Sequence, residues 1–275
     1  MTPTRPIMRY FGGKWKLAKW IISHFPPHRI YVEPFGGAAS VLMQKPRSYA
    51  EIYNDLDSEV VNVFQVLRNP VQAIELERQL RLTPYSRQEF ESAYLDTDDP
   101  IEKARRTIIR TGMGFGSNAI YKDFSSGFRS KKRNGTTPAH DWITYPDLIT
   151  AYRDRLMGVV IESREAIDII AQHDSDETLF YIDPPYLPKT RTRLRQYYAI
   201  EMDESDHCRL AMVLHNISGM VLLSGYDSEL YENLYPDWEK IERPTFAQGA
   251  RPRTEILWIN DVASMSLPLF AQGKS

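Results

Sequence analysis

An acidic tetrapeptide at residue 183 has the residue types of a site that binds an amine. Asp183-Pro184-Pro185-Tyr186 directly follows Leu179-Phe180-Tyr181-Ile182, an apolar run typical of a buried strand. Two consecutive prolines stiffen the turn and lack a backbone N–H, so carbonyl oxygens and the Asp183 carboxylate remain as acceptors beside an aromatic ring. Such a pocket suits a planar substrate with an exocyclic amine. The structural alternative is a proline-rich turn that closes the strand, with Tyr186 in the core.

A glycine loop after the first predicted strand indicates a second binding element. Glu33-Pro34-Phe35-Gly36-Gly37 begins at the end of the strand at 30–33, and Asp55 follows the next strand at 49–53. Glycines let the backbone approach a ligand closely, and an acid about twenty residues later can bind ribose hydroxyls. The spacing G-x-G-x-x-G is absent, and Glu33 would repel a pyrophosphate but tolerate a cationic group. The loop therefore favours a nucleoside without phosphates over a nicotinamide dinucleotide.

A third motif, Arg9-Tyr10-Phe11-Gly12-Gly13-Lys14, precedes a predicted helix at 17–22. Taken alone, it favours an ordinary loop in which Lys14 is solvated. The motif becomes informative only together with the other two.

Strands alternate with helices around these motifs, which predicts an α/β fold with a mainly parallel sheet and helices on both faces. Such sheets bind ligands at the carboxyl ends of their strands, where all the acidic motifs fall. Asp57 is placed to cap one of the helices. We expect strands at 30–33, 49–53, 158–161, 178–182, 219–223 and 255–259, and helices at 58–67, 166–172 and 206–216.

The alternation is interrupted between residues 69 and 157. This stretch has helix-like segments at 71–80, 86–94 and 100–111, followed by a basic region rich in glycine, serine and asparagine at 112–135. We therefore expect a core domain formed by 1–68 and 158–275, and an inserted, mostly helical subdomain formed by 69–157.

Composition restricts the class of protein. The chain has 275 residues, of which 42% are hydrophobic and 25% charged, which is ordinary for a globular protein with a full core. It lacks an apolar run of the roughly 20 residues that a membrane helix needs, and its N-terminus does not resemble a secretory signal. Cys208 is the only cysteine, and the histidines are scattered. We expect no disulfide, no metal site and a cytoplasmic location.

Charge is segregated along the chain although the formal net charge is only −2. Basic residues without acidic neighbours occupy 1–30 and 186–195, and the densest basic cluster is 129–133. The acidic residues concentrate in 196–242. This distribution predicts one surface that faces phosphates, the alternative being that each cluster is an ordinary solvated face.

Together and in this order, the motifs resemble the Dam-like DNA adenine-N6 methyltransferases of the D12 class, alpha group. The resemblance is carried by Tyr-Phe-Gly-Gly-Lys at 10–14, Glu-Pro-Phe-Gly-Gly at 33–37, Asn-Asp at 54–55 and Asp-Pro-Pro-Tyr at 183–186. Ser-Gly-Tyr at 224–226 and Arg-Pro-Arg-Thr-Glu at 251–255 fit the family's later segments. It implies a Rossmann-like methyltransferase sheet and S-adenosylmethionine as cofactor. Ser163-Arg164 departs from the acidic and aromatic residues that many relatives carry near the cofactor's adenine. The implied cofactor contacts are Tyr10, Lys14, Glu33, Pro34, Phe35, Gly36, Gly37, Asp55 and Asp183.

The resemblance also implies a mechanism, in which Asp183, Pro184, Pro185 and Tyr186 are catalytic. The target adenine is flipped out of the duplex, because its amine cannot meet the methyl donor within the stack. Tyr186 would stack on the flipped ring, while the Asp183 carboxylate and the Pro184 carbonyl accept hydrogen bonds from the amine. The freed lone pair would then attack the methyl group in line. Cys208 is expected only to pack in its helix.

We therefore predict site-specific methylation of adenine N6 in double-stranded DNA by a monomer or weak dimer, in a bacterial cytoplasm or in a host cytoplasm if viral. Restriction–modification, viral anti-restriction and host marking remain open as roles. N6 methylation of RNA, amide methylation of a protein, and DNA binding without catalysis are the alternatives. Most of the predicted DNA contacts bind phosphates, with some base reading by Arg129 or Asn118. The set is Asn118, Lys122, Arg129, Lys131, Lys132, Arg133, Arg191, Arg193, Arg195, Arg251 and Arg253.

Overall fold

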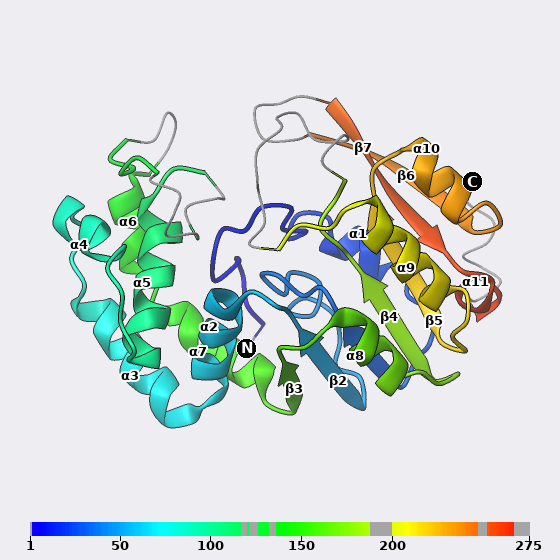
Figure 1. The fold of residues 1–275 in the computed structure, drawn as a ribbon. Coiled ribbons are helices and arrows are strands. Elements are labelled where there is room, and N and C mark those ends of the chain that lie inside the picture. Colours follow the sequence, from blue (N-terminus) through cyan, green and yellow to red (C-terminus); the bar gives the residue numbers. More distant parts are fainter. Residues whose placement is uncertain are drawn as a thin grey trace. The chain divides into compact units, whose positions relative to one another are not determined.

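A computed structural model describes residues 2–116, 120, 126–131, 136–187, 200–246 and 252–266, with only the backbone at 246, 252 and 253 (Figure 1). The chain forms two compact units. The first, which we call the helical unit, comprises Met1–Ala18, Gly37–Lys45 and Asp57–Ser163. The second, the sheet unit, comprises Lys19–Gly36, Pro46–Leu56 and Arg164–Ser275.

The sheet unit is built on strands in the order β2-β1-β4-β5-β7-β6. Parallel pairing joins β1 to β2, β1 to β4, and β4 to β5. Strand β7 is antiparallel to both β5 and β6. The predicted mainly parallel sheet is confirmed, but neither β6 nor the antiparallel direction of β7 was predicted. The strands are β1 (Ile30–Glu33), β2 (Ala50–Asn54), β4 (Thr178–Ile182), β5 (Met220–Gly225), β6 (Glu239–Phe246) and β7 (Pro252–Ile259).

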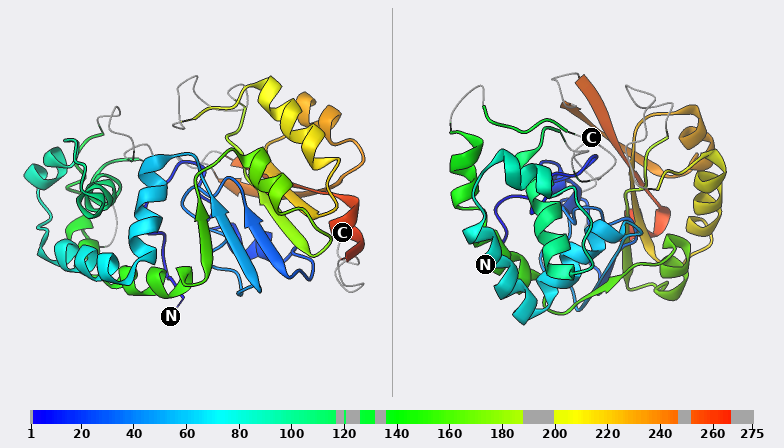
Figure 2. Two further views of the ribbon diagram at one scale, coloured as in Figure 1. Left: turned by 60° about the horizontal axis from the view of Figure 1, so that its bottom comes forward. Right: turned by 60° about the vertical axis from the view of Figure 1, so that its left-hand side comes forward.

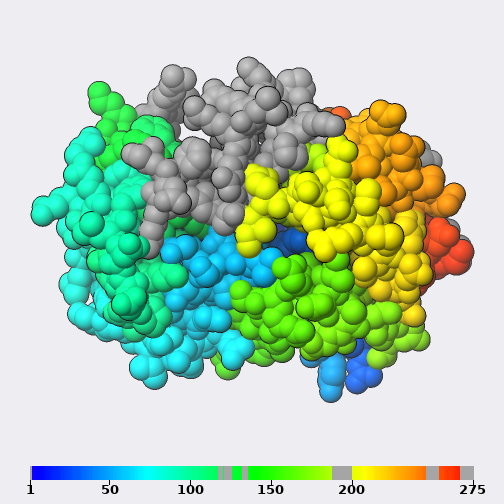
Figure 3. All heavy atoms as spheres, in the orientation of Figure 1, coloured from blue at the N-terminus to red at the C-terminus, as the bar shows by residue number. Residues whose placement is uncertain are grey.

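Helices α8 (Ala166–Gln172), α9 (Glu204–Leu214) and α10 (Glu229–Leu234) cover one face of this sheet (Figure 2). Helices α8 and α9 lie side by side on the surface, as the space-filling view also shows (Figure 3). Alternate strand residues such as Val32 and Phe180 point into this core, as the two-residue period of a strand requires.

The opposite face of the sheet is packed by residues that follow α1 (Ala18–Ile22). The Phe25 ring lies 5.7 Å from the Tyr31 ring and 6.2 Å from the Tyr181 ring, centroid to centroid. Both tyrosines are fully or almost fully buried. A short helix, α11 (Asp261–Ser266), follows β7.

In the helical unit, polar side chains cap the N-termini of several helices. The Asp57 side chain accepts hydrogen bonds from the first backbone N–H groups of α2, as predicted. Asn69 and Asp99 cap α3 and α5, each of which begins with proline, a residue suited to the first helical position. The elements are α2 (Ser58–Arg68), α3 (Pro70–Leu82), α4 (Arg87–Ser92), α5 (Pro100–Met113), α6 (Pro138–Ile143), α7 (Asp147–Leu156) and β3 (Val159–Glu162).

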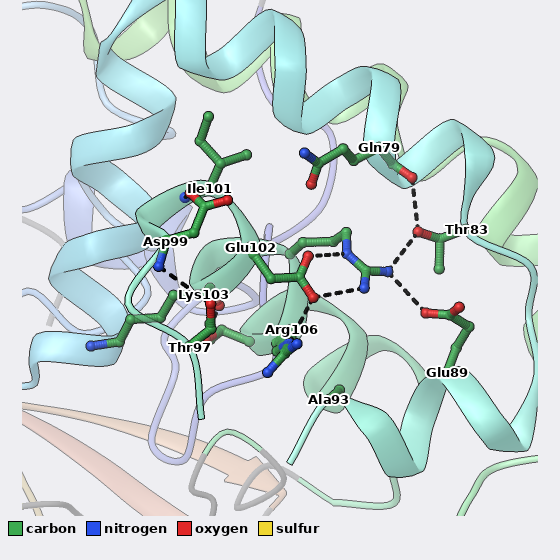
Figure 4. A network of polar contacts seen from close by, with 12 residues as sticks. Gln79, Thr83, Glu89, Ala93, Thr97, Asp99, Ile101, Glu102, Lys103 and Arg106 are labelled. Atoms are coloured by element: carbon green, nitrogen blue, oxygen red, sulfur yellow. Dashed lines mark hydrogen bonds and ion pairs between the residues drawn. The ribbon is translucent and has the colours of Figure 1, made fainter. Parts of the chain in front are cut away.

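Charged side chains tie α3, α4 and α5 together. Arg105 donates to Glu102 on its own helix, to Glu89 of α4 at 2.9 Å and to Thr83 at the end of α3 at 3.0 Å (Figure 4). Arg106 donates to the same Glu102 at 2.6 Å. Because charge-assisted hydrogen bonds are directional, they fix the angles between these helices as well as holding them together.

A buried ion pair joins α5 to α2. Arg110 is fully buried and donates to Oε2 of Glu59 at 2.7 Å. The same guanidinium donates to the backbone carbonyls of Ala93 and Ile120. Burial by itself raises the pKa of Glu59, but the Arg110 charge and the hydrogen bonds from Arg110 and Thr107 outweigh it, so this pKa lies below its ordinary value.

The variant Glu59→Gln tests this pair. With the folded-state pKa below the unfolded one, the pair stabilises the protein above the unfolded pKa and loses its contribution as the pH falls through the folded pKa. At neutral pH the variant should lose about 3 kcal/mol of unfolding free energy, because Arg110 keeps a buried charge without its counter-ion. It should also lose less stability than the wild type on acidification. Urea unfolding at neutral and acidic pH measures both effects.

The matched control is Glu75→Gln, which removes a surface ion pair with Arg78 on α3. Exposed pairs contribute little, so its unfolding curve should stay close to that of the wild type at both pH values. Equal effects of the two substitutions would contradict a special role for the buried pair.

Candidate active site

The carboxyl ends of the parallel strands bring predicted site residues together in the sheet unit. Val32 of β1 is paired with Ile52 of β2 and with Phe180 of β4. Because the three strands run in the same direction, their carboxyl ends lie at one edge of the sheet. Glu33 ends β1, Asn54 ends β2, and Asp183 follows β4 directly. Asp55 comes next after Asn54, so three acidic residues share this edge.

Glu33 is held from within its own strand. Its side chain is only 2% exposed, and its Oε2 accepts a hydrogen bond from the Tyr31 hydroxyl at 3.0 Å. Burial, and then the charge of Glu33, raise the pKa of Tyr31 well above its ordinary value. The phenol therefore stays protonated and serves as a permanent donor, which fixes the direction of the carboxylate.

Asn54 ties two loops to the end of β2. Its side-chain amide donates to the carbonyls of Pro34 and Arg164, both at 2.9 Å, and its Oδ1 accepts from the Arg164 backbone N–H at 2.9 Å. Its own carbonyl accepts from Gly36 N at 2.8 Å. The sequence indicated Asn54 only as a neighbour of Asp55. Asn54 is 1% exposed, and a buried amide of this kind needs hydrogen-bond partners. The only sequence signal for this linking role is a polar amide at the end of a predicted strand.

The two glycines of the loop are required for different reasons. In the sheet unit, a Cβ on Gly36 would lie 2.1 Å from the Tyr53 ring. In the helical unit, Gly37 has φ +46° and a Cβ there would lie 2.7 Å from the Tyr10 ring. Ala39 also has a positive φ, of 52°, which costs an alanine roughly 1–2 kcal/mol. The loop thus keeps a conformation that ordinary residues would not select.

The N-terminal motif lies in the helical unit, where its residues form a tight turn. Gly13 N donates to Tyr10 O at 3.2 Å, and the Tyr10 ring packs over Gly37. Lys14 is only 5% exposed, and its Nζ donates to Gly12 O at 3.3 Å. The alternative of a solvated Lys14 is therefore wrong.

The tetrapeptide after β4 has no regular secondary structure. Asp183 and Pro185 are half-buried, whereas Pro184 and Tyr186 are buried. The Tyr186 hydroxyl donates to Oε1 of Glu255 in β7 at 2.7 Å. The sequence did not predict this contact of Glu255, because nothing in the local pattern joins two residues so far apart in the chain.

Few of the predicted DNA contacts are described. Asn118, Lys122, Lys132, Arg133, Arg191, Arg193, Arg195 and Arg251 lie outside the described residues, and of Arg253 only the backbone in β7 is described.

Arg129 and Lys131 are described in the helical unit, where Lys131 is exposed. Arg129 and Arg9 both donate to the carbonyl of Gly112, at 3.3 and 2.7 Å. Burial, and then the charge of Arg129, lower the pKa of Arg9 to about 10. Two cations thus share one backbone acceptor at the end of α5.

Within the part of the chain that the structure describes, no group of three or more His, Cys, Asp or Glu side chains could hold a metal ion. None of the helices described there is long and apolar enough to cross a membrane.

The family model that matches this chain and three of its known relatives are all described as methyltransferases or methylases. The model of a family described as D12 class N6 adenine-specific DNA methyltransferase matches residues 10–246. The chain is 27% identical to the type II methyltransferase M1.LlaDCHI of Lactococcus lactis subsp. cremoris, over 93% of this chain and 95% of that protein. It is 22% identical to the DNA adenine methylase of Escherichia coli K12, over 86% and 85% of the two chains. A DNA adenine methylase of Vibrio cholerae El Tor is 23% identical, over 86% of each chain.

The variant Asn54→Ala tests the linking role of this side chain. It removes the three side-chain hydrogen bonds to Pro34 and Arg164, of which the one to the Pro34 carbonyl is buried and the two to the Arg164 backbone are part-buried. We expect a loss of about 2–4 kcal/mol in unfolding free energy, measured by urea denaturation. The matched control is Asn62→Ala on α2, which removes one exposed hydrogen bond to Pro100 O and should cost less than about 1 kcal/mol. Equal losses would contradict the proposed importance of Asn54.

Proposed function

The chain belongs to the D12 class of N6 adenine-specific DNA methyltransferases, and from this we propose that it transfers a methyl group from S-adenosylmethionine to an adenine flipped out of double-stranded DNA. The family match covers most of the chain, so the resemblance inferred from the three motifs is confirmed. Methylation of adenine N6 in DNA is accordingly the activity of the chain. The cofactor, the flipped base and the roles of single residues are the proposal.

The observation that carries the proposal is the set of acceptors at the edge of the sheet unit. Parallel pairing brings Glu33, Asp55 and Asp183 to the carboxyl ends of neighbouring strands. Pro184 and Pro185 add carbonyls but no N–H donors. A site of this kind favours ligands that donate hydrogen bonds or carry positive charge, as both an adenine amine and a sulfonium cofactor do.

The residues present fit S-adenosylmethionine by the chemistry of this set. Carboxylates suit its sulfonium, its ammonium group and its ribose hydroxyls, and the glycine loop has the backbone shape that close approach requires. We propose Glu33 to Gly37, Asp55 and Asp183 as contacts from this loop and the strand ends, and Tyr10 and Lys14 as further contacts. When bound, the cofactor supplies an activated methyl group.

Side-chain and backbone groups of the tetrapeptide would then act on the adenine. The Asp183 carboxylate and the Pro184 carbonyl accept the two amine hydrogens, which directs the nitrogen lone pair out of the ring plane. The same acceptors stabilise the positive charge that grows on nitrogen during transfer. Tyr186 provides an aromatic face for the flipped base, and positioning supplies much of the rate.

We propose that residues 69–157 recognise the target sequence and that basic side chains there bind phosphates. The exposed Lys131 and the neighbouring cations Arg9 and Arg129 support this role. Each guanidinium has five N–H groups, so one that donates to a single carbonyl can also donate a hydrogen bond to a phosphate oxygen.

Asp183→Ala tests the reaction. The variant should transfer methyl groups at least about a hundredfold more slowly while it binds DNA with nearly wild-type affinity, because only the amine acceptor is lost. Tritium transfer from S-adenosylmethionine to unmethylated duplex, followed by nucleoside analysis, measures the product, and fluorescence anisotropy measures DNA binding. The control Asp168→Ala changes an exposed carboxylate on α8 and should keep full activity. Unchanged turnover in Asp183→Ala would disprove the mechanism, and label in RNA or protein in place of DNA would overturn the substrate.

Replacement of Lys131, Lys132 and Arg133 by alanine tests the phosphate-facing surface. Each phosphate contact contributes about 0.9 to the slope of log affinity against log salt, so the triple variant should flatten that slope by up to about 2.7. Anisotropy titrations at several salt concentrations give the slope. Arg209→Ala, an exposed arginine paired with Asp206 on α9, serves as the control and should leave it unchanged. An unaltered slope in the triple variant would place the phosphate contacts elsewhere.

A further inference from the structure

Strand β7 extends past the carboxyl end of β5. Their antiparallel register pairs Leu222 with Ile259, and Gly225, the last residue of β5, with Ile256. The β7 residue before Ile256 is Glu255, so its position lies beyond the end of β5. Because β4 and β5 are parallel, this is the edge at which Asp183 lies, and Figure 1 shows β7 starting on the side where β4 ends. An antiparallel strand thus delivers a carboxylate to the catalytic edge.

Glu255 meets Tyr186 there. The Tyr186 hydroxyl donates to Oε1 of Glu255 at 2.7 Å, between side chains that are 5% and 2% exposed. The ring of Tyr226, just after β5, meets the Tyr186 ring edge to face, with centroids 4.7 Å apart and an interplanar angle of 73°. One contact therefore holds the hydroxyl end of Tyr186, and the other restrains the plane of its ring.

The Tyr186 hydroxyl keeps the proton that it donates to Glu255. Burial, and then the charges of Asp183 and Glu255, raise the pKa of Tyr186 well above its ordinary value, so the phenol remains a donor. Phenylalanine beside an apolar side chain would fill the same space without desolvating a carboxylate, and such replacements are often at least as stable. Packing alone therefore does not explain the hydrogen-bonded pair of Tyr186 and Glu255. The need to fix the orientation of the Tyr186 ring does explain it.

We infer that Glu255 is a positioning residue for methyl transfer, which orients the Tyr186 ring against which the target adenine stacks. The inference rests on the proposed function of Tyr186 as the stacking surface. A ring already held in the productive plane spares the complex the ordering of that side chain when the base arrives. Glu255 acts through Tyr186, so its loss should slow the chemical step and leave the affinities for cofactor and DNA unchanged.

The experiment compares Tyr186→Phe, Glu255→Leu, Glu255→Gln and the double variant Tyr186→Phe/Glu255→Leu in the full chain. Single-turnover methyl transfer gives the chemical rate, anisotropy and calorimetry give the affinities for duplex and S-adenosylmethionine, and thermal unfolding reports on folding. Tyr231→Phe is the matched control, since it removes a buried hydroxyl that bonds to His207 on α9 at 3.1 Å. Tyr186→Ala tests the underlying stacking role.

We expect Tyr186→Phe and Glu255→Leu each to slow the chemical step about tenfold, and the double variant to be no slower than either. Glu255→Gln, which keeps an acceptor oxygen, should recover most of the rate. Tyr231→Phe should lose thermal stability but keep the wild-type rate. If the role of Glu255 were purely structural, Glu255→Leu would behave in the same way. Should Glu255→Leu fail to fold, Tyr186→Phe breaks the same hydrogen bond by removing a single oxygen atom.

The outcomes separate this inference from the proposed function. Absence of methyl transfer to DNA by the wild type, or a wild-type rate in Tyr186→Ala, would overturn both. A slow Tyr186→Ala together with wild-type rates in Tyr186→Phe and Glu255→Leu would overturn the role of Glu255 alone. Additive losses in the double variant would also contradict it, because the two side chains would then act separately.

Discussion

Parallel pairing of β1 with β2 and β4 is the constraint on which the site in the sheet unit depends. Each strand carries one polar or acidic residue at or just after its carboxyl end, namely Glu33, Asn54 and Asp183. A shift of one residue in either pairing would turn alternate side chains to the opposite face, moving the tyrosines of one face into the core beneath α8 to α10. Residues of these strands alternate between that core and the face that carries Tyr31 and Tyr181. This alternation favours one register, and the register fixes where the acceptors lie.

Buried donors then orient the acceptors that the strands deliver. The Tyr31 hydroxyl holds Glu33, the Asn54 amide holds the carbonyl of Pro34, and the Tyr186 hydroxyl bonds to Glu255. Each of these donors is buried, and both phenols have a raised pKa and stay protonated. Hydrogen bonds in a poorly hydrated environment are stronger and more directional than at the surface, so the edge is organised before any ligand binds.

The sequence predicted those parts of the fold that depend on short stretches of chain. The strand 178–182 and the helix capped by Asp57 follow from local composition and were confirmed. It did not predict β6, whose charged residues hide a strand that exists because β7 pairs with it. The contacts of Glu255 with Tyr186 and of Asn54 with Arg164 were not predicted for the same reason, since the partners are distant in sequence. The clash that a side chain at Gly36 would make with Tyr53 likewise appears only once β1 and β2 are paired.

In the helical unit, charged side chains hold the helices to one another. One ion pair joins Arg110 of α5 to Glu59 of α2. Arg105 of α5 pairs with Glu89 of α4 and with Glu102 of its own helix. Those predicted DNA contacts that lie within residues 69–157 follow α5 and end at residue 133. Substitutions in that stretch would remove no charge from these ion pairs. If the proposed function of residues 69–157 is right, stability and sequence preference therefore depend on different residues of this unit.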